Sequence, residues 1–348
     1  MLLRNRANLT VSALVLALAA CLPSTAAGQA RLFQSVSPLS IRIEAPFHRM
    51  ISEKEGRFAA RMILTGNAAD TIGFEISPRG KSRMVGGICN FTGFMLYFSE
   101  SEKGNPFEGQ HVLPVVSHCK DRDSYEDLVL LEYLAYRILN SVTDMSLRVR
   151  LAHFEYYDSE RARRVTTRYG FFLENWDDLA ARKGLERLDV PRVPPLEYEY
   201  PARTVFEVFQ YLIGNTDWSY SLPAPDERFC CHNTVPIGHS VGPVYPLPFD
   251  FDQSGLVDAP YATVDPSLPI RNVRERLFRG VCGPLEALNA ALGRFEAVKP
   301  EILSLFEVKS LLSNRARSRA TQYIEDFYRT IADDRKVNRE MVSKCRSP

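Results

Sequence analysis

Short apolar runs separated by turn residues occupy residues 40–120, and this pattern predicts an antiparallel sheet. Gly, Pro and Asn residues punctuate five runs, at 39–43, 58–64, 71–76, 94–98 and 112–116. Two later runs, 147–156 and 168–173, are further strand candidates. We therefore expect the first half of the chain to be rich in sheet.

A single helix is expected within this sheet-rich half. Ser124 and Asp127 have the spacing of a capping box, so the helix should begin there. The apolar positions that follow recur at helical spacing; they are Leu128, Leu131, Ala135, Ile138 and Val142.

The second half of the chain shows mainly helical periodicity after a Pro-rich stretch at 189–201. A helical face over 205–212 stops at Gly214, a residue with which helices commonly end. Residues 215–252 read as a loop and a hairpin, although three prolines argue against a central strand. The last helix carries one apolar stripe: Leu312, Ala316, Ala320, Tyr323, Phe327 and Ile331. We expect an α+β protein with two lobes, 31–175 and 176–348.

The N-terminus has the layout of a cleavable export signal over residues 1–30. Arg4 and Arg6 precede an uncharged apolar run that is too short for a transmembrane helix, and small residues surround Ala27 and Ala30. Cys21 follows Leu-Ala-Ala as in a bacterial lipobox, so a lipid anchor at Cys21 and a soluble product both stay open. We expect no transmembrane span in the mature chain and a location in the periplasm, at the cell surface or outside the cell.

Charge and cysteine content narrow the classes of function. The 43 basic and 42 acidic residues balance, which argues against a nucleic-acid partner. Six cysteines follow the leader, and in an oxidising compartment they predict disulfides. We expect Cys89 to pair with Cys119, and Cys282 with Cys230 or Cys231.

A Gly-x-Ser-x-Gly sequence at 238–242 resembles the nucleophile elbow of hydrolases. That motif requires a helix starting at the serine and a downstream histidine. Here Pro243 and an extended run follow, and no histidine occurs after His239. We read the segment as a hairpin turn.

Four polar residues in 213–262 suggest phosphoryl transfer. Asp217 follows a helix, Asn233 follows His232, and Asp250 and Asp252 end an apolar run. Phosphoryl transfer needs a carboxylate for the acceptor hydroxyl, an amide oxygen on the metal, and an aspartate that bridges metal and phosphate. The order of these residues matches that requirement, while each of them alone is also an ordinary turn or cap residue.

The same region resembles the CotH-type spore-coat kinases and related secreted atypical kinase-like proteins. The resemblance rests on GNTDWS from Gly214, the pair His232 and Asn233, and PFDFDQSGLVD from Pro248, with RGKSR from Arg79 and GFFLE ending at Glu174 upstream. It covers roughly residues 70–265. It implies a two-lobed kinase-like fold, with Asp217 as the acceptor base, Asn233 and Asp250 as metal ligands, and Asp252 in support.

The chain departs from this family at the residue that grips the phosphates. The strand over 87–98 lacks the usual lysine and has Cys89 and Asn90 near that place. The alternative cations are Lys81, Arg79, Arg83 and Lys120. Glu132, at the edge of the apolar helix face, would pair with such a cation, and Glu174 would lie in the connection between the lobes.

These observations lead to one expected function and two alternatives. We expect metal-dependent transfer of a phosphoryl or nucleotidyl group from ATP, with Mg²⁺ or Mn²⁺, to a protein or envelope acceptor. The first alternative is a catalytically inactive kinase-like binding module. The second is a glycosyltransferase, because Asp250 and Asp252 also form a D-x-D sequence.

Overall fold

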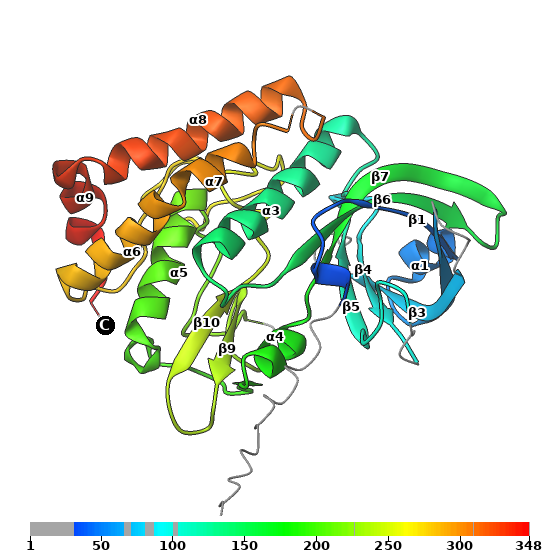
Figure 1. The fold of residues 1–348 in the computed structure, drawn as a ribbon, viewed down its shortest axis with the longest axis horizontal. Helices are drawn as coiled ribbons and strands as arrows, with labels where there is room; N and C mark the ends of the chain where they lie inside the picture. Colours follow the sequence, from blue (N-terminus) through cyan, green and yellow to red (C-terminus); the bar gives the residue numbers. More distant parts are fainter. Residues whose placement is uncertain are drawn as a thin grey trace, which may run out of the picture.

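The strands of the first half of the chain close into a seven-stranded barrel (Figure 1). The computed structural model describes residues 31–65, 71–80, 87–99, 104–225, 227–308 and 310–347. The barrel order is β1-β2-β3-β4-β5-β7-β6, and β1 pairs in parallel with β6 to close it. The strands are β1 (Leu39–Ala45), β2 (Phe58–Leu64), β3 (Thr71–Arg79), β4 (Gly93–Tyr97), β5 (Val112–Val116), β6 (Val149–Asp158) and β7 (Arg163–Leu173).

Closure of the barrel shows that the expected two-lobed kinase-like fold is wrong. A typical kinase has a sheet-containing first lobe and a helical second lobe, whereas here the first seven strands form a closed barrel beside helices. The apolar periodicity located the strands, but it carries no information on whether the first and sixth strands pair. That pairing joins Leu39 to Ala152 and Ala45 to Asp158.

Aromatic side chains fill the barrel. Phe94, Phe154, Tyr156 and Phe172 are fully buried inside it, together with Phe47 from α1 (Phe47–Glu53). Side chains alternate between the two faces of a strand, and β3 accordingly alternates exposed and buried positions. The interior is therefore a packed core.

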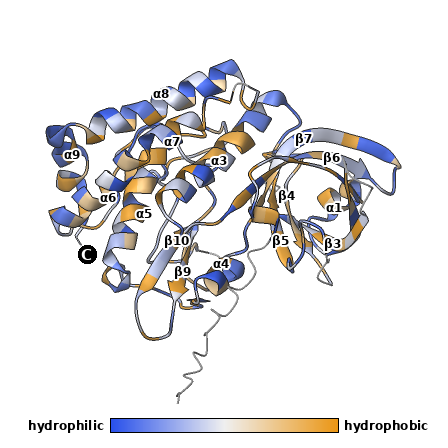
Figure 2. Ribbon diagram, in the orientation of Figure 1, coloured by the Kyte–Doolittle hydropathy of each residue, from blue (hydrophilic) through white to orange (hydrophobic). Residues whose placement is uncertain are grey.

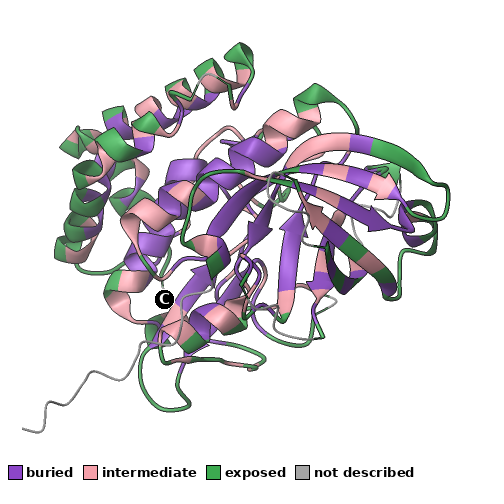
Figure 3. Ribbon diagram, turned by 45° about the vertical axis from the view of Figure 1, so that its right-hand side comes forward, coloured by how far each residue is buried: buried purple, intermediate pink, exposed green. Residues whose placement is uncertain are grey.

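The helices that follow β5 lie together on one side of the barrel, where α3 packs directly against it, and they share a second core with the adjoining strands (Figures 1 and 2). They are α3 (Asp123–Val142), α4 (Trp176–Arg182), α5 (Tyr200–Ile213), α6 (Leu285–Ala297), α7 (Lys299–Ser304), α8 (Asn314–Ile331) and α9 (Asp334–Glu340). The helix α3 packs against β6 and β7 on one side and α7 on the other. Figure 3 shows buried positions concentrated along α3, α5 and the strands next to them.

The capping box expected for α3 is absent. The helix begins at Asp123, after Arg122, whose side chain makes no capping hydrogen bond. Asp127 instead accepts hydrogen bonds from the backbone and side chain of Ser313. The residue that caps the start of α8 has therefore replaced the local partner.

A small second sheet carries the hairpin expected in the second half. Its order is β10-β9-β8, with β8 (Glu186–Arg187), β9 (Thr234–Gly238) and β10 (Val244–Pro248). Pro236 lies opposite Pro246 in the β9–β10 register. The hairpin thus forms despite the prolines that weakened its prediction.

Three disulfides join the cysteines of the described region. Cys89 pairs with Cys119, as predicted. The pairing expected for Cys282 is wrong, because Cys282 bonds to Cys345 while Cys230 and Cys231 bond to each other. The C-terminal segment runs beside Val281, which brings Cys345 to its partner.

The export signal and Cys21 lie outside the described residues. Within the described parts of the chain, no helix is both long and apolar enough to cross a membrane.

Candidate functional site

Asp217 lies in a loop that is fixed directly after α5. The helix ends at Gly214, which has a φ of 65°. The side chain of Asn215 accepts a hydrogen bond from the backbone of Asp217 at 3.0 Å, and Trp218 Nε1 donates to the carbonyl of Asn215 at 2.9 Å. Arg279 donates to the carbonyl of Trp218 at 2.9 Å from outside the loop. These contacts hold the Asp217 carboxylate in one place.

Three side chains donate hydrogen bonds to that carboxylate. His232 Nε2 lies 2.8 Å from Oδ1, while Asn233 Nδ2 and Gln253 Nε2 lie 3.1 and 2.6 Å from Oδ2. The Asp217 side chain remains 29% exposed. The carboxylate is therefore oriented and still within reach of a molecule from solvent.

The hydrogen bond to Asp217 raises the pKa of His232 above its usual 6.5. Burial acts in the opposite direction, and the negative charges of Asp217, Glu227 and Asp250 add to the increase. Asp250 makes the smallest of these contributions.

Asn233 is oriented by Asp217. Its Nδ2 also donates to the Asp217 carbonyl at 2.7 Å, so the nitrogen end of the amide must face Asp217. Among the described residues, no hydrogen bond involves Asn233 Oδ1. The amide oxygen is thus available as a ligand. Asn233 lies next to β9, and its carbonyl accepts from Phe249 N at 3.1 Å, across the hairpin that leads to Asp250.

Asp250 is tied to α3 by its backbone. Its N–H donates to the hydroxyl of Tyr136 at 2.9 Å, and its φ is 60°. Tyr136 is fully buried, and burial together with the charges of Glu132 and Asp250 raises its pKa well above the usual range. Tyr136 thus links Asp250 to the helix that also carries Glu132.

A small pocket of about 60 Å³ joins residues that are far apart in sequence. Arg79 at the end of β3, Glu132 on α3 and Asp250 after β10 line it together with Ser117. A pocket of this size holds one or two waters, whereas pockets for drug-sized ligands are about 300–1,000 Å³. It can accept an ion or part of a phosphate.

The remaining predicted residues are placed differently. Asp252 is only 5% exposed. Glu174 accepts hydrogen bonds from Arg182 at 2.8 and 3.1 Å and from the backbone of Arg148 at 2.9 Å, so it already has two structural partners. Lys120 lies 5.6 Å from the ring of Tyr125. Lys81 and Arg83 lie outside the described residues.

The sequence predicted no role for three residues of the site: His232, Gln253 and Tyr136. His232 and Gln253 are next to Asn233 and Asp252 in the chain, so adjacency was the available signal. Tyr136 is on the buried face of α3, where nothing distinguishes it from an ordinary core residue.

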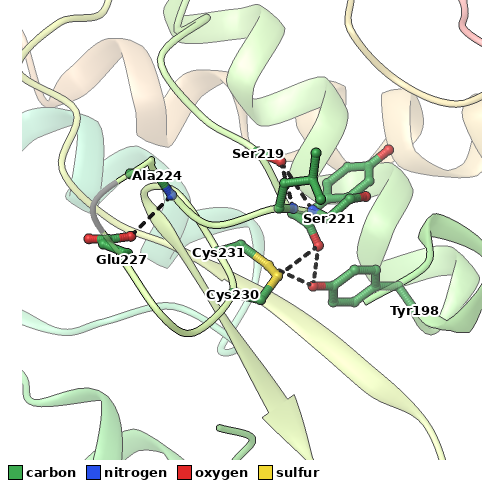
Figure 4. Close-up of a disulfide and its surroundings, with 9 residues drawn as sticks. Tyr198, Ser219, Ser221, Ala224, Glu227, Cys230 and Cys231 are labelled. Atoms are coloured by element: carbon green, nitrogen blue, oxygen red, sulfur yellow. Dashed lines mark hydrogen bonds between the residues drawn. A yellow bond between two sulfur atoms is a disulfide. The ribbon is translucent and has the colours of Figure 1, made fainter. Parts of the chain in front are cut away.

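The neighbouring residues Cys230 and Cys231 form a disulfide directly before His232 and Asn233 in the chain. Figure 4 shows this disulfide and its surroundings. The hydroxyl of Tyr198 donates to the carbonyl of Tyr220 at 2.6 Å and lies 3.7 Å from Cys231 Sγ. Both cysteines are buried, at 7% and 5% exposure. The segment before His232 is therefore anchored in a core.

The donor chemistry fits a magnesium ion that keeps several waters. Asn233 and Asp250 offer oxygen atoms, and Mg²⁺ usually takes one or two carboxylates together with substrate phosphates. Across the described residues, no group of three His, Cys, Asp or Glu side chains could hold a metal.

Comparison with protein-family models and with the curated proteins gives no match for this chain.

Proposed function

We propose that this protein transfers a phosphoryl group from ATP to an acceptor hydroxyl outside the cytoplasm. The supporting observation is the contact of Asn233 with Asp217. Asn233 Nδ2 donates to the backbone carbonyl oxygen and to the carboxylate Oδ2 of Asp217. Asn233 directly precedes the β9–β10 hairpin, and Asp250 follows it. In this proposal Asp217 would be the base beside Asn233 as one oxygen ligand, and Asp250 would supply the second. The resemblance to CotH-type kinases agrees with this proposal in its residues, although the expected fold is wrong.

Asp217 would orient the acceptor hydroxyl and take its proton as the oxygen attacks the γ-phosphorus, while the bond from that phosphorus to the β–γ bridging oxygen breaks and ADP leaves. Its hydrogen bonds to His232 and Gln253 keep the carboxylate pointed in one direction. Asn233 Oδ1 and the Asp250 carboxylate would hold Mg²⁺ or Mn²⁺, which neutralises phosphate charge when bound. Arg79 at the neighbouring pocket is the described cation best placed for a phosphate oxygen.

The small volume of the pocket limits how a nucleotide can bind. At about 60 Å³ it has room for the ion or a terminal phosphate, so the nucleoside would lie on the adjoining surface. Export is proposed from the leader pattern, and three disulfides are compatible with an oxidising compartment. A protein or an envelope component would be the acceptor.

Incubation with ATP labelled at the α or the γ position tests the proposal. We expect label in an acceptor from γ-labelled ATP with Mg²⁺, and none from α-labelled ATP. Asp217→Asn should lower transfer by about 10²–10⁴-fold, the usual contribution of a general base, and leave binding intact. Asp250→Ala should abolish Mg²⁺-dependent ATP binding in calorimetry without unfolding the chain.

Asp334→Asn, at an exposed position in α9, is the matched control and should keep both properties. Transfer from α-labelled ATP would indicate nucleotidyl transfer instead. Full activity in Asp217→Asn would refute the assigned base.

The second candidate is a binding module without catalysis, favoured by the small pocket and by the strand over 87–98 that lacks lysine. For this candidate, the folded protein should bind no ATP with Mg²⁺ or Mn²⁺ in calorimetry. Saturable binding would reject it in favour of an ATP-dependent protein.

A further inference from the structure

A second pocket, of about 250 Å³, is lined by residues of α3 and of α8. The loop of residues 256–260, which follows the Asp250 turn, forms another wall, and Arg274 closes one side. None of the residues assigned a role in the candidate site lines it. It is therefore a separate cavity.

The floor of this pocket is apolar. Four of its residues are at most 5% exposed and belong to the core shared by the helices. Two others are partly buried against the same core. The floor consists of Leu128, Leu131, Leu256, Val257, Ala316 and Ala320.

The rim carries three arginines and two aspartates, and both aspartates already have partners. Asp127 accepts from Ser313 N at 3.0 Å and from Ser313 Oγ at 2.6 Å. Asp258 forms ion pairs with Arg319 and, at 3.6 Å, with Arg274.

Arg315 is the rim charge that remains available. It is exposed and forms no ion pair with any residue in the described ranges. It lies in the first turn of α8, where the helix dipole also favours a negative charge. The rim therefore has an excess of positive charge above an apolar floor.

We propose that this pocket binds a small organic anion with an apolar body, of the kind represented by octanoate. A cavity of roughly 150 Å³ holds benzene, so 250 Å³ has room for a chain of about eight carbons. The chain would cover the apolar floor, and the carboxylate would meet Arg315 at the start of α8. This match of shape and charge is what selects an amphipathic anion over a neutral or a fully polar molecule.

Anion binding at this pocket does not depend on phosphoryl transfer. It requires only the pocket, its floor and its charged rim. Binding can therefore be measured whether or not ATP is a substrate.

Calorimetry of the full mature chain, with its disulfides intact, tests the proposal with three probes. We expect octanoate to bind at one saturable site, and 1-octanol and acetate to bind at least tenfold more weakly. Arg315→Gln should weaken octanoate at least tenfold, because it removes the charge and leaves the apolar floor. Arg317→Gln is the matched control, since Arg317 is on the same helix but does not line this pocket.

Ala316→Leu gives an independent test, because a larger side chain at the floor should block octanoate while Arg315 is kept. Thermal unfolding checks that each variant is folded. Equal affinity of octanol and octanoate, equal affinity of Arg315→Gln and the unaltered protein, or no saturation by octanoate would each overturn the proposal.

Discussion

His232 and Asp217 form a hydrogen bond whose ionic character depends on pH. Both side chains are partly exposed, at 35% and 29%, so solvent weakens their attraction but does not abolish it. The hydrogen bond favours the protonated histidine and raises its pKa. Since the folded pKa lies above that of the unfolded chain, the added stability is fully present below about pH 6.5 and is lost as pH rises through the folded value.

We predict that nuclear magnetic resonance titration gives His232 a pKa above 6.5. Asp217→Asn should lower this pKa, because the neutral amide no longer stabilises the imidazolium. Asp250→Asn should lower it less, because Asp250 is the smaller contributor. An unchanged His232 pKa in Asp217→Asn would contradict the pairing.

At the scale of elements, a hydrogen bond joins the loop after α5 to the loop after Asp250, close to Tyr323 of α8. Gly255 N donates to the carbonyl of Gly214 at 3.0 Å, which links the loop of Asp217 to the loop that follows Asp250. A β-carbon at either glycine would meet the Tyr323 hydroxyl too closely. Both glycines are therefore needed for the close approach that positions the site.

Gly214→Ala should destabilise the protein by about 2–4 kcal/mol, since it adds a left-handed alanine and a steric clash. Gly293→Ala is the matched control in α6, where no atom lies within 4 Å of the added carbon. We expect that control to stabilise the chain by about 0.5–1 kcal/mol in chemical denaturation. Adding Tyr323→Phe should restore part of the loss in Gly214→Ala, and failure to do so would argue against the clash.

At the scale of the whole molecule, two disulfides join distant segments in different parts of the chain. Cys89–Cys119 belongs to the barrel side, with a separation of 30 residues. Cys282–Cys345 spans 63 residues and fixes the C-terminal segment beside Gly280. Closing the 63-residue loop should therefore remove more conformational entropy from the unfolded chain than closing the 30-residue loop.

Replacement of Cys282 and Cys345 together by Ser should lower the free energy of unfolding by about 4 kcal/mol, by the loop-entropy relation. Ser343→Ala, at an exposed neighbour, should leave stability within about 0.5 kcal/mol. Denaturant titration without reductant measures both. A loss below about 1 kcal/mol for the double variant would show that this bond does not constrain the unfolded chain as expected.

Local patterns in the sequence determined the elements. Short apolar runs bounded by turn residues located β2, β3 and β4, because runs of this kind are typical of strands. Gly214 marked the end of α5, since its positive φ is accessible to glycine without strain. The order of Asp217, Asn233 and Asp250 along the chain also indicated these residues as candidates for one site. Asp217 follows the end of α5, and Asn233 and Asp250 flank the β9–β10 hairpin.

Tertiary structure decided everything that depends on contacts between distant segments. The pairing of β1 with β6, the bond between Cys282 and Cys345, and the contact of Asp127 with Ser313 have no local periodicity or spacing to announce them. The meeting of Asp250 with Tyr136 is of the same kind. Each of these contacts forms because packing in the folded protein brings together residues that are far apart in the sequence. The free energy of the contacts therefore depends on the complete fold.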